Sequence, residues 1–311
     1  MISNKEKNFV SAVIYVYDQE KVIYSFLEKI NRALREHFEK YEIICVNDDS
    51  KDNTVDEIRR FAKTLSGNIV SVLNMSYYQG LELSMNAGMD LSIGDFVYEF
   101  DIISDDYPDD IIFSCYQRSL KGFDIVSVSP KENLQWTSSL FYLLFNKAAH
   151  LQYSLRTDYF RVLSRRAINR VHAMSKTIPY RKALYANCGL KMDTLEVEKI
   201  QSDRKVLRKS KERLGTAADS IILFTDLAYK SAFAFAAFMM LLTVMIGIYT
   251  VGVYVSGKPV EGWTTTMLFL VFGFFGLFVI LTMAIKYLSI LLRLSFNRQK
   301  YIIESIEKLN Y

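Results

Sequence analysis

Two long apolar runs near the C-terminus place the strongest constraint on how this chain can fold. Residues 231–255 and 264–285 contain no charged side chain. Each run exceeds the roughly 20 residues that a helix needs to cross about 30 Å of hydrocarbon. The link between them, residues 256–263 with the sequence SGKPVEGW, is too short to form a domain. We therefore predict a transmembrane helical hairpin within residues 230–289.

Basic residues flank the two runs. Because positively charged flanks stay on the cytoplasmic side, we expect a multi-pass protein of the cell (inner) membrane whose N-terminal domain and C-terminus are both cytosolic. The cluster before the first run either signals this topology alone or also binds anionic headgroups or a lipid phosphate. The flanking residues are Arg204, Lys205, Arg208, Lys209, Lys211 and Arg213 before the first run, and Arg293, Arg298 and Lys300 after the second.

The composition is that of a globular domain joined to a membrane segment. Half of the residues are hydrophobic (50%) and 23% are charged, which excludes a disordered chain. The net charge of +4 is small, and no nucleic-acid partner is expected. Cys45, Cys115 and Cys188 are odd in number and lack metal-ligand spacing. Free thiols in a reducing compartment are the expected state.

The first half of the chain alternates between strand-like and helix-like segments. This alternation predicts an α/β fold over residues 1–203, with a mostly parallel sheet and helices on both of its faces. Ligands of such sheets bind beyond the carboxyl ends of the strands, where acidic residues gather at 47–52 and 101–109. The predicted strands are 9–17, 42–46, 68–73, 95–100 and 125–128, and the predicted helices are 21–41, 55–65 and 81–91.

The pattern is looser in the rest of the chain. Residues 157–171 read as a strand followed by a helix. Residues 204–229 are expected to form basic, amphipathic juxtamembrane helices, because 210–227 has a basic start and an apolar end. A core helix of the soluble domain fits 210–227 nearly as well. The tail, 290–311, is expected to be cytosolic, with helical structure in part of 297–311.

Several sequence runs occur in an order and spacing typical of one enzyme family. They are EIICVNDDSKDNT, QGLELSMNAGMDLSIGDFVYEFD, SSLFY and YFRVLSRR, followed by the hairpin. Because these runs occur in this order and spacing, the chain resembles family 2 glycosyltransferases with a GT-A (Rossmann-like) fold. Among them it is most similar to membrane-anchored enzymes that transfer sugars to dolichyl or undecaprenyl phosphate. The resemblance covers almost the whole chain, although each run alone is weakly specific.

The resemblance implies a nucleotide-sugar donor whose diphosphate is chelated by Mn²⁺ or Mg²⁺. An Asp-x-Asp motif holds the cation, which stabilises the leaving diphosphate. Asp101 matches the first metal-binding Asp and is thereby implied in catalysis and donor binding. Asp48 matches the carboxylate that recognises the base. Tyr17 and Ser50 are the other implied donor contacts.

The resemblance also implies an acceptor site. Arg161 and Arg165 match positions near the acceptor phosphate and the diphosphate, and guanidinium groups bind oxyanions in a bidentate way. Surface ion pairing is the alternative role for both. Ser210 and Lys211 resemble a pair that contacts the lipid phosphate. Related proteins assemble through their membrane helices, which implies a homo-oligomer here.

The chain departs from the family pattern at important positions. Ile103 replaces the second metal-binding Asp, and Glu82 replaces a small Gly. Tyr159 stands at the catalytic base position. Asp158 is one residue early and, on a strand, would point to the opposite face. A base matters less for an anionic acceptor, which loses no proton. Asp105, Asp106 and Asp109 could supply a replacement metal ligand, although a solvated acidic loop fits these residues better.

Three functional hypotheses remain. The favoured one is an inverting transferase that moves a sugar, expected to be UDP-linked, to a polyprenyl phosphate at the cytosolic leaflet for cell-surface glycan synthesis. The second is a degenerate, non-catalytic relative that binds a nucleotide or lipid, or scaffolds a polysaccharide-assembly complex. The third is a transferase with a glycan-lipid acceptor. The hairpin, the basic flank and the arginine positions favour the enzyme, with Asp101, Asp158 and Arg161 as its catalytic residues.

Overall fold

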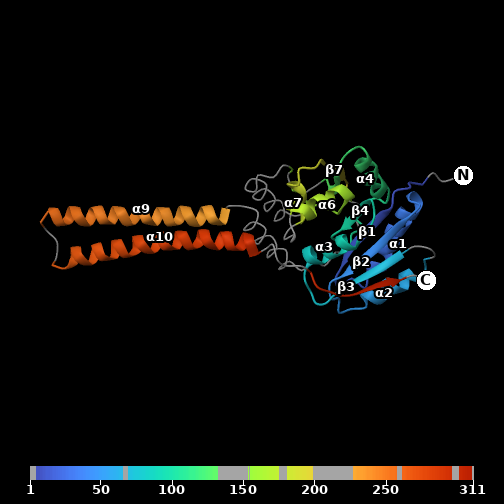
Figure 1. Cartoon of the computed structure of the whole chain (residues 1–311), viewed down its shortest axis with the longest axis horizontal. Coiled ribbons are helices and arrows are strands. Elements are labelled where there is room, and N and C mark those ends of the chain that lie inside the picture. Colours follow the sequence, from blue (N-terminus) through green and yellow to red (C-terminus); the bar gives the residue numbers. More distant parts are fainter. Residues whose placement is uncertain are drawn as a thin grey trace. The chain divides into compact units, whose positions relative to one another are not determined.

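A computed structural model describes residues 5–65, 69–131, 153, 155–174, 181–198, 227–257, 261–295 and 301–309 (Figure 1). The chain divides into two compact units. The first unit contains Met1–Leu214 and Arg298–Tyr311, and the second contains Gly215–Asn297. The chain thus leaves the first unit, forms the second and returns to the first.

The described residues of the first unit form an 8-stranded sheet with the order β7-β5-β6-β4-β1-β2-β3-β8. Neighbouring strands are parallel except around β6 and β8, which are antiparallel to their neighbours. The sheet is therefore mostly parallel, as predicted. The strands are β1 (Val10–Val16), β2 (Tyr41–Asn47), β3 (Ile69–Met75), β4 (Phe96–Phe100), β5 (Ile125–Pro130), β6 (Phe160–Ser164), β7 (Met192–Val197) and β8 (Ile303–Leu309).

Helices cover both faces of this sheet, also as predicted. Alternate side chains of β1 divide between two cores, with Ala12 and Ile14 in one and Val13 in the other. The first core also contains the apolar sides of α1 (Ile23–His37), α2 (Thr54–Ala62) and α4 (Asp110–Leu120). The second contains those of α3 (Leu81–Leu91), α6 (Arg165–Met174) and α7 (Arg181–Ala186). Because both faces are covered, the central strands are apolar on both sides.

The described part of the C-terminal tail differs from the expectation. Residues 301–309 contain no helix and instead supply β8, which pairs with β3 from Val70↔Leu309 to Met75↔Ile303. Without this partner, β3 would be an edge strand with unpaired backbone groups. The sequence IESIEKL places apolar residues between polar ones, as a further strand allows. Its local preference for a strand is modest, so the pairing with the distant β3 decides its structure.

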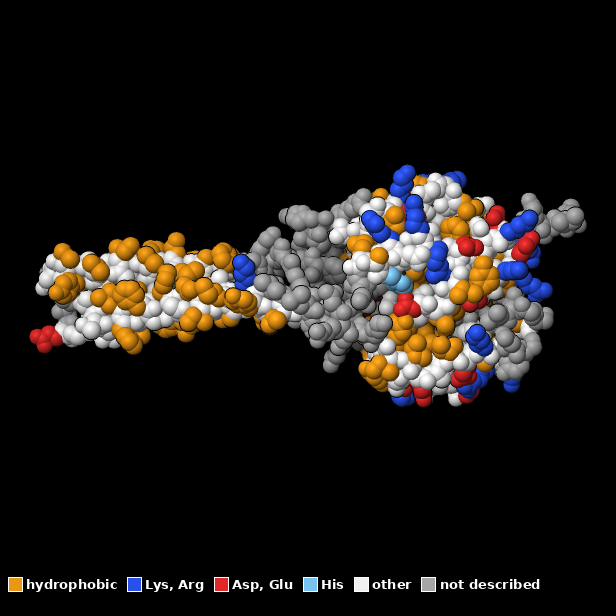
Figure 2. Space-filling model, viewed as in Figure 1, with side chains coloured by type: hydrophobic (Ala, Val, Ile, Leu, Met, Phe, Trp, Pro, Cys, Tyr) orange, Lys and Arg blue, Asp and Glu red, His pale blue; other side chains and the backbone are white. Residues whose placement is uncertain are grey.

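The described part of the second unit contains two helices that pack together, α9 (Leu227–Val255) and α10 (Trp263–Ser295). Phe233–Val255 and Trp263–Leu288 are long and apolar enough to cross a membrane, with mean hydropathies of 2.1 and 2.7. Their apolar side chains are mostly exposed (Figure 2), unlike those of a core helix in a soluble protein. Thr243 and Thr250 donate their hydroxyl protons to carbonyls one turn earlier, which satisfies them inside an apolar helix.

Close packing of α3 onto the sheet depends on Gly88. A Cβ atom at this position would lie 2.5 Å from methyl carbons of both Val13 and Val46. We therefore expect Gly88→Ala to lower the free energy of unfolding by about 1–3 kcal/mol, the usual cost of overpacking a core. Thermal or urea unfolding of the two proteins measures this difference. Glu28→Ala, on the exposed side of α1, is the control and should change stability little; an equal effect of both changes would contradict the packing argument.

Candidate active site

The acidic residues after β2 and β4 lie at one edge of the sheet. Asp48 follows β2 and Asp101 follows β4, and β1 pairs with both strands in parallel. The carboxyl ends of these three strands therefore meet, as the sequence predicted. The two aspartates have different surroundings: Asp48 is hydrogen-bonded to a loop, and Asp101 belongs to an ionic cluster.

Asp48 holds the loop between β3 and α3. Its side chain is buried, and it accepts hydrogen bonds from the Tyr15 hydroxyl (2.9 Å) and from the backbone N–H groups of Gln79 (2.8 Å) and Gly80 (2.9 Å). Gly80 has a φ of 85°, a conformation that favours glycine. Tyr15 thus has a structural role, because its hydroxyl helps to hold Asp48.

The other residues implied in donor binding lie near the same loop. The Tyr17 ring contacts the Tyr78 ring, with centroids 4.8 Å apart. The Ser50 hydroxyl accepts a hydrogen bond from the backbone N–H of Asp18 (3.1 Å). Two aromatic rings and the Asp48 carboxylate therefore lie at the loop between β3 and α3.

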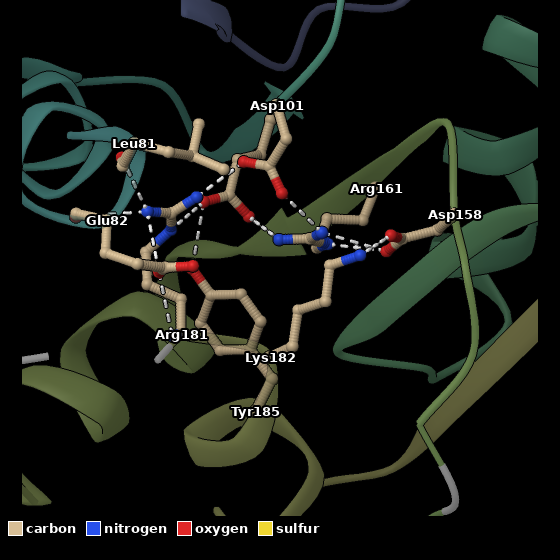
Figure 3. A network of polar contacts seen from close by, with 9 residues as sticks. Leu81, Glu82, Asp101, Asp158, Arg161, Arg181, Lys182 and Tyr185 are labelled. Carbon is tan, nitrogen blue, oxygen red and sulfur yellow. Dashed lines mark hydrogen bonds and ion pairs between the residues drawn. The ribbon is translucent and has the colours of Figure 1, made fainter. Parts of the chain in front are cut away.

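Arg161, on β6, is the first centre of the ionic cluster (Figure 3). The residue is 2% exposed. Nη1 contacts Glu99 at 2.6 Å, Nη2 contacts Asp101 at 2.8 Å and Nε contacts Asp158 at 2.9 Å. Arg161 therefore forms ion pairs with three buried carboxylates. These are not surface ion pairs, and in this arrangement they leave the guanidinium group unavailable to bind an oxyanion.

Arg181, the first residue of α7, is the second centre and is 1% exposed. Nε contacts Glu99 and Nη2 contacts Asp101, both at 2.5 Å, while Nη1 lies 3.0 Å from Glu82. Nη1 also donates to the carbonyls of Leu81 and Glu82 at the start of α3. This one side chain joins α7, α3 and β4.

Two further residues complete the cluster. Lys182 forms an ion pair with Asp158, and the Tyr185 hydroxyl donates to Glu99 at 3.2 Å. Asp158 precedes β6, which begins at Phe160. Asp158 is therefore not on the strand, and the alternation of strand side chains does not turn it to the opposite face. Our prediction for its direction was wrong, and Asp158 belongs to the cluster.

The cluster holds three cationic groups, Arg161, Arg181 and Lys182, against the four carboxyl groups of Glu82, Glu99, Asp101 and Asp158. Burial alone would lower the pKa of both arginines, but the surrounding carboxylates hold each arginine pKa well above its usual value. Burial raises the pKa of Glu82, with Arg181 opposing this effect. The guanidinium groups thus stay charged, and the internal charges nearly cancel.

A divalent cation on Asp101 does not fit these residues. Both Asp101 oxygens accept from guanidinium groups. Ile103, at the position of the second ligand, is apolar and packs in the core. The acidic loop supplies no substitute, because Lys29 lies 3.9 Å from Asp105 and 3.6 Å from Asp109. Across the described ranges, no group of three or more His, Cys, Asp or Glu residues could hold a metal ion.

The structure describes two of the residues implied in acceptor binding, Arg161 and Arg165, and places only Arg161 in the cluster. Arg165 donates to the carbonyls of Ser92 and Gly94, both at 2.9 Å, and so fixes the turn between α3 and β4. Ser210 and Lys211 lie outside the described residues.

A polar cavity of about 270 Å³ lies beside the cluster. Its lining includes Asp158, Arg161 and Lys182, together with hydroxyl groups from β5 and β7. The Ser129 hydroxyl in this lining is buried and makes no hydrogen bond within the described part of the chain. The cavity therefore offers an unsatisfied hydroxyl next to charged groups, as expected where a polar ligand binds.

Sequence reasoning missed Glu99, Arg181, Lys182 and Tyr185. One signal was available, because Glu99 interrupts the otherwise apolar strand FVYEF. A carboxylate in a buried strand needs a cationic partner. The local sequence pattern does not identify that partner, since Arg181 lies 82 positions away along the chain.

Removing one arginine should leave buried carboxylates without a counter-charge. We expect Arg181→Met to lower the free energy of unfolding by about 3–5 kcal/mol at pH 7. The loss should shrink as the pH falls towards 4.5, the ordinary pKa of Glu82. The reason is that orphaned carboxyl groups have a raised pKa in the folded state, so protonation favours folding. Urea unfolding from pH 4 to 8 measures both effects.

Arg60→Met is the matched control, because Arg60 forms an exposed pair with Glu57 on α2. This change should have a much smaller effect on stability and little dependence on pH. A pH-independent loss in Arg181→Met would instead indicate lost packing and contradict the electrostatic explanation.

The comparisons with known proteins agree with this architecture. Residues 11–135 match the family described as Glycosyl transferase family 2. An uncharacterised glycosyltransferase of Synechocystis is 24% identical over 77% of this chain and 80% of its own. A prophage bactoprenol glucosyl transferase homologue of Escherichia coli is 26% identical over 63% of this chain and 66% of its own length. A bactoprenol glucosyl transferase of Shigella phage SfX is 22% identical over 85% of this chain and 88% of its own length.

A similar solved structure is the mannosyltransferase PcManGT from Pyrobaculum calidifontis in complex with GDP-Man and Mn²⁺. Its TM-score is 0.50 at 16% identity, over 70% of this chain and 63% of that one. At this identity the likeness concerns the fold. Together with this likeness of fold, the match of residues 11–135 shows that the chain contains a domain of Glycosyl transferase family 2 with a GT-A-like sheet.

Proposed function

We propose that the protein is a membrane-bound, inverting transferase that moves a sugar from a nucleotide-sugar, UDP-linked, to a polyprenyl phosphate at the cytosolic leaflet, for cell-surface glycan synthesis. The observation that carries this proposal is the connection of the glycosyltransferase unit to the apolar hairpin at both ends. The first unit contains Met1–Leu214, which precede the hairpin in the chain, and Arg298–Tyr311, which follow it. An enzyme tied in this way works next to lipid, where a polyprenyl phosphate presents its headgroup.

The return of the chain to the first unit also supports the topology. β8 pairs with β3, so a hairpin that enters the membrane must come back to the side from which it started. The basic residues at 204–213 favour the cytosol for that side. The bactoprenol glucosyl transferases among the relatives provide independent support for a lipid acceptor.

The proposed reaction needs an attacking anion and a stabilised leaving group. An acceptor phosphate oxygen attacks the anomeric carbon, the bond to the nucleotide diphosphate breaks and the configuration inverts. The phosphate is already ionised, so no base has to remove a proton. The cavity presents Lys182 and Arg161 next to Asp158. An acceptor phosphate would compete with Asp158 for Lys182, and the guanidinium groups would offset the charge of the leaving diphosphate.

One observation favours a second candidate function. In the described arrangement, both oxygens of Asp101 and all three cations of the cluster are engaged by protein groups. A site closed in this way suits a non-catalytic relative that binds a nucleotide or lipid in an assembly complex. The transferase requires the cluster to exchange partners when substrates bind, whereas the second candidate does not.

Nucleotide binding and transfer separate the two candidates. We expect the detergent-purified protein to bind UDP with the same affinity in Mn²⁺ and in EDTA, because Asp101 is held by guanidinium groups and not by a metal. Calorimetry measures this binding, and Asp48→Ala is the variant expected to lose it. Transfer from a panel of UDP-sugars to a short-chain polyprenyl phosphate then tests for the enzyme.

The outcomes are distinct. Metal-independent binding with transfer supports the proposal, and binding without transfer to any tested lipid favours the second candidate. Loss of binding in EDTA would show that Asp101 releases its arginines to a metal. Absence of UDP binding under every condition would contradict the proposed UDP-linked donor.

The predicted topology can be tested by labelling cysteines. Cys45, Cys115 and Cys188 are buried, so an added exposed cysteine gives the main signal. In sealed inverted membrane vesicles, a membrane-impermeant maleimide should label Glu304→Cys on β8 and leave Ser256→Cys at the end of α9 unlabelled. Right-side-out vesicles should give the reverse pattern. Labelling of both variants from the same side would contradict a membrane-spanning hairpin.

A further inference from the structure

The described C-terminal tail, residues 301–309, is connected to the donor-side loops by two separate hydrogen-bonded routes. These loops comprise residues 47–50, after β2, and residues 76–80, after β3. The tail follows the membrane hairpin in the chain, far from both loops in sequence. It nevertheless lies beside them, because β8 pairs with β3.

The first route runs through Gln79. Its side chain donates to the carbonyl of Ile302 at 2.6 Å and accepts from the N–H of Ile302 at 2.9 Å. The backbone N–H groups of Gln79 and Gly80 donate to the Asp48 carboxylate. A third bond joins the N–H of Ser76 to the Ile302 carbonyl at 3.2 Å. Ile302 and Asp48 thus hold the loop from its two sides.

The second route runs through two buried asparagines. The Asn74 side-chain amide donates to Ser305 at 3.0 Å and to Glu307 at 2.9 Å. Its oxygen accepts from the Asn47 amide at 2.9 Å. The Asn47 oxygen accepts from the backbone N–H of Ser50 at 3.0 Å. Each asparagine is less than a tenth exposed, so water offers a poor substitute if one partner is lost.

The tail is itself firmly fixed. Glu307 accepts two hydrogen bonds from one nitrogen of Arg59, Nη2, both at 2.9 Å, and a third from Nε at 3.1 Å. The Tyr301 hydroxyl contacts Asp90 at 2.5 Å, and Leu309 belongs to the first core. Glu307 therefore has two separable contacts, one to Arg59 and one to Asn74.

We infer that residues 301–309 are a positioning element for the donor-side loops. Glu307 and Ser305 orient Asn74, which orients Asn47 and through it the backbone of residues 47–50. Ile302 does the same for the backbone that surrounds Asp48. The effect on nucleotide binding rests on the proposed function, whereas the effect on the loops does not. Because the tail follows α10, the membrane hairpin is joined through it to the donor side.

Hydrogen exchange of the full chain in detergent tests the inference. Glu307→Ala should raise exchange in peptides covering residues 47–52 by about tenfold, the effect expected for losing roughly one supporting hydrogen bond. Gln79→Met, which keeps the side-chain length, should raise exchange in peptides covering 76–80. Exchange in β1 should be unchanged in both variants, which shows that the fold persists.

Two control variants isolate the route. Arg59→Met removes the ion pair of Glu307 but leaves its bond to Asn74, and should alter residues 47–52 much less. Glu304→Gln changes an exposed side chain on the same strand and should have no effect. Faster exchange confined to the tail in Glu307→Ala, or equal effects of Glu307→Ala and Arg59→Met, would overturn the inference.

Calorimetry with UDP then separates this inference from the proposed function. Weaker UDP binding in Glu307→Ala, together with faster loop exchange, is the expected result. If wild-type protein fails to bind UDP but the loops respond as described, the donor proposal fails and the positioning role stands. If the loops do not respond, the positioning role fails whatever the binding result.

Discussion

The pairing of two buried guanidinium groups with four carboxyl groups is the interaction on which the arrangement of this site depends. Burying an ion costs several kcal/mol, and the cost is offset only where partners and hydrogen bonds are complete. Arg161 joins β6 to β4, and Arg181 joins α7 to β4 and to the start of α3. Each element is therefore held where its charges can be satisfied, and a shift of any one would leave a buried charge unpaired.

The departures from the family pattern form one consistent set around these arginines. Glu82, where the family has a small residue, provides a partner for Arg181. Ile103 stands where the resemblance implies the second carboxylate of a metal site. Glu99, which is not one of these departures, binds both arginines. A metal cation from solution would balance the charge of Asp101 only while the cation is bound. A guanidinium group is attached to the chain, cannot be removed by a chelator, and holds Asp101 in the described arrangement.

The sequence predicted the features that depend on local pattern. Apolar strands alternating with amphipathic helices indicated the parallel sheet, and uncharged runs indicated α9 and α10. The placement of Asp48 and Asp101 followed, because parallel strands bring their carboxyl ends to one edge. Two features depend instead on contacts between distant residues. β8 is a short strand with three charged residues, and only its pairing with β3 reveals its structure. The ionic cluster likewise needs α7 beside β4, which local periodicity does not predict.

The positions of β7 and β8 connect the hairpin through the chain to the two opposite edges of the sheet. The strand order places β7 at one edge and β8 at the other, and the hairpin lies between them in the chain. The chain thus leaves the sheet on the side of the ionic cluster and cavity, and it returns on the side of Asp48. Buried amide groups hold the returning strand, because Ser305 and Glu307 accept hydrogen bonds from Asn74, which in turn accepts one from Asn47. A segment that follows the hairpin in the chain therefore completes the polar surroundings of the loop that carries Asp48.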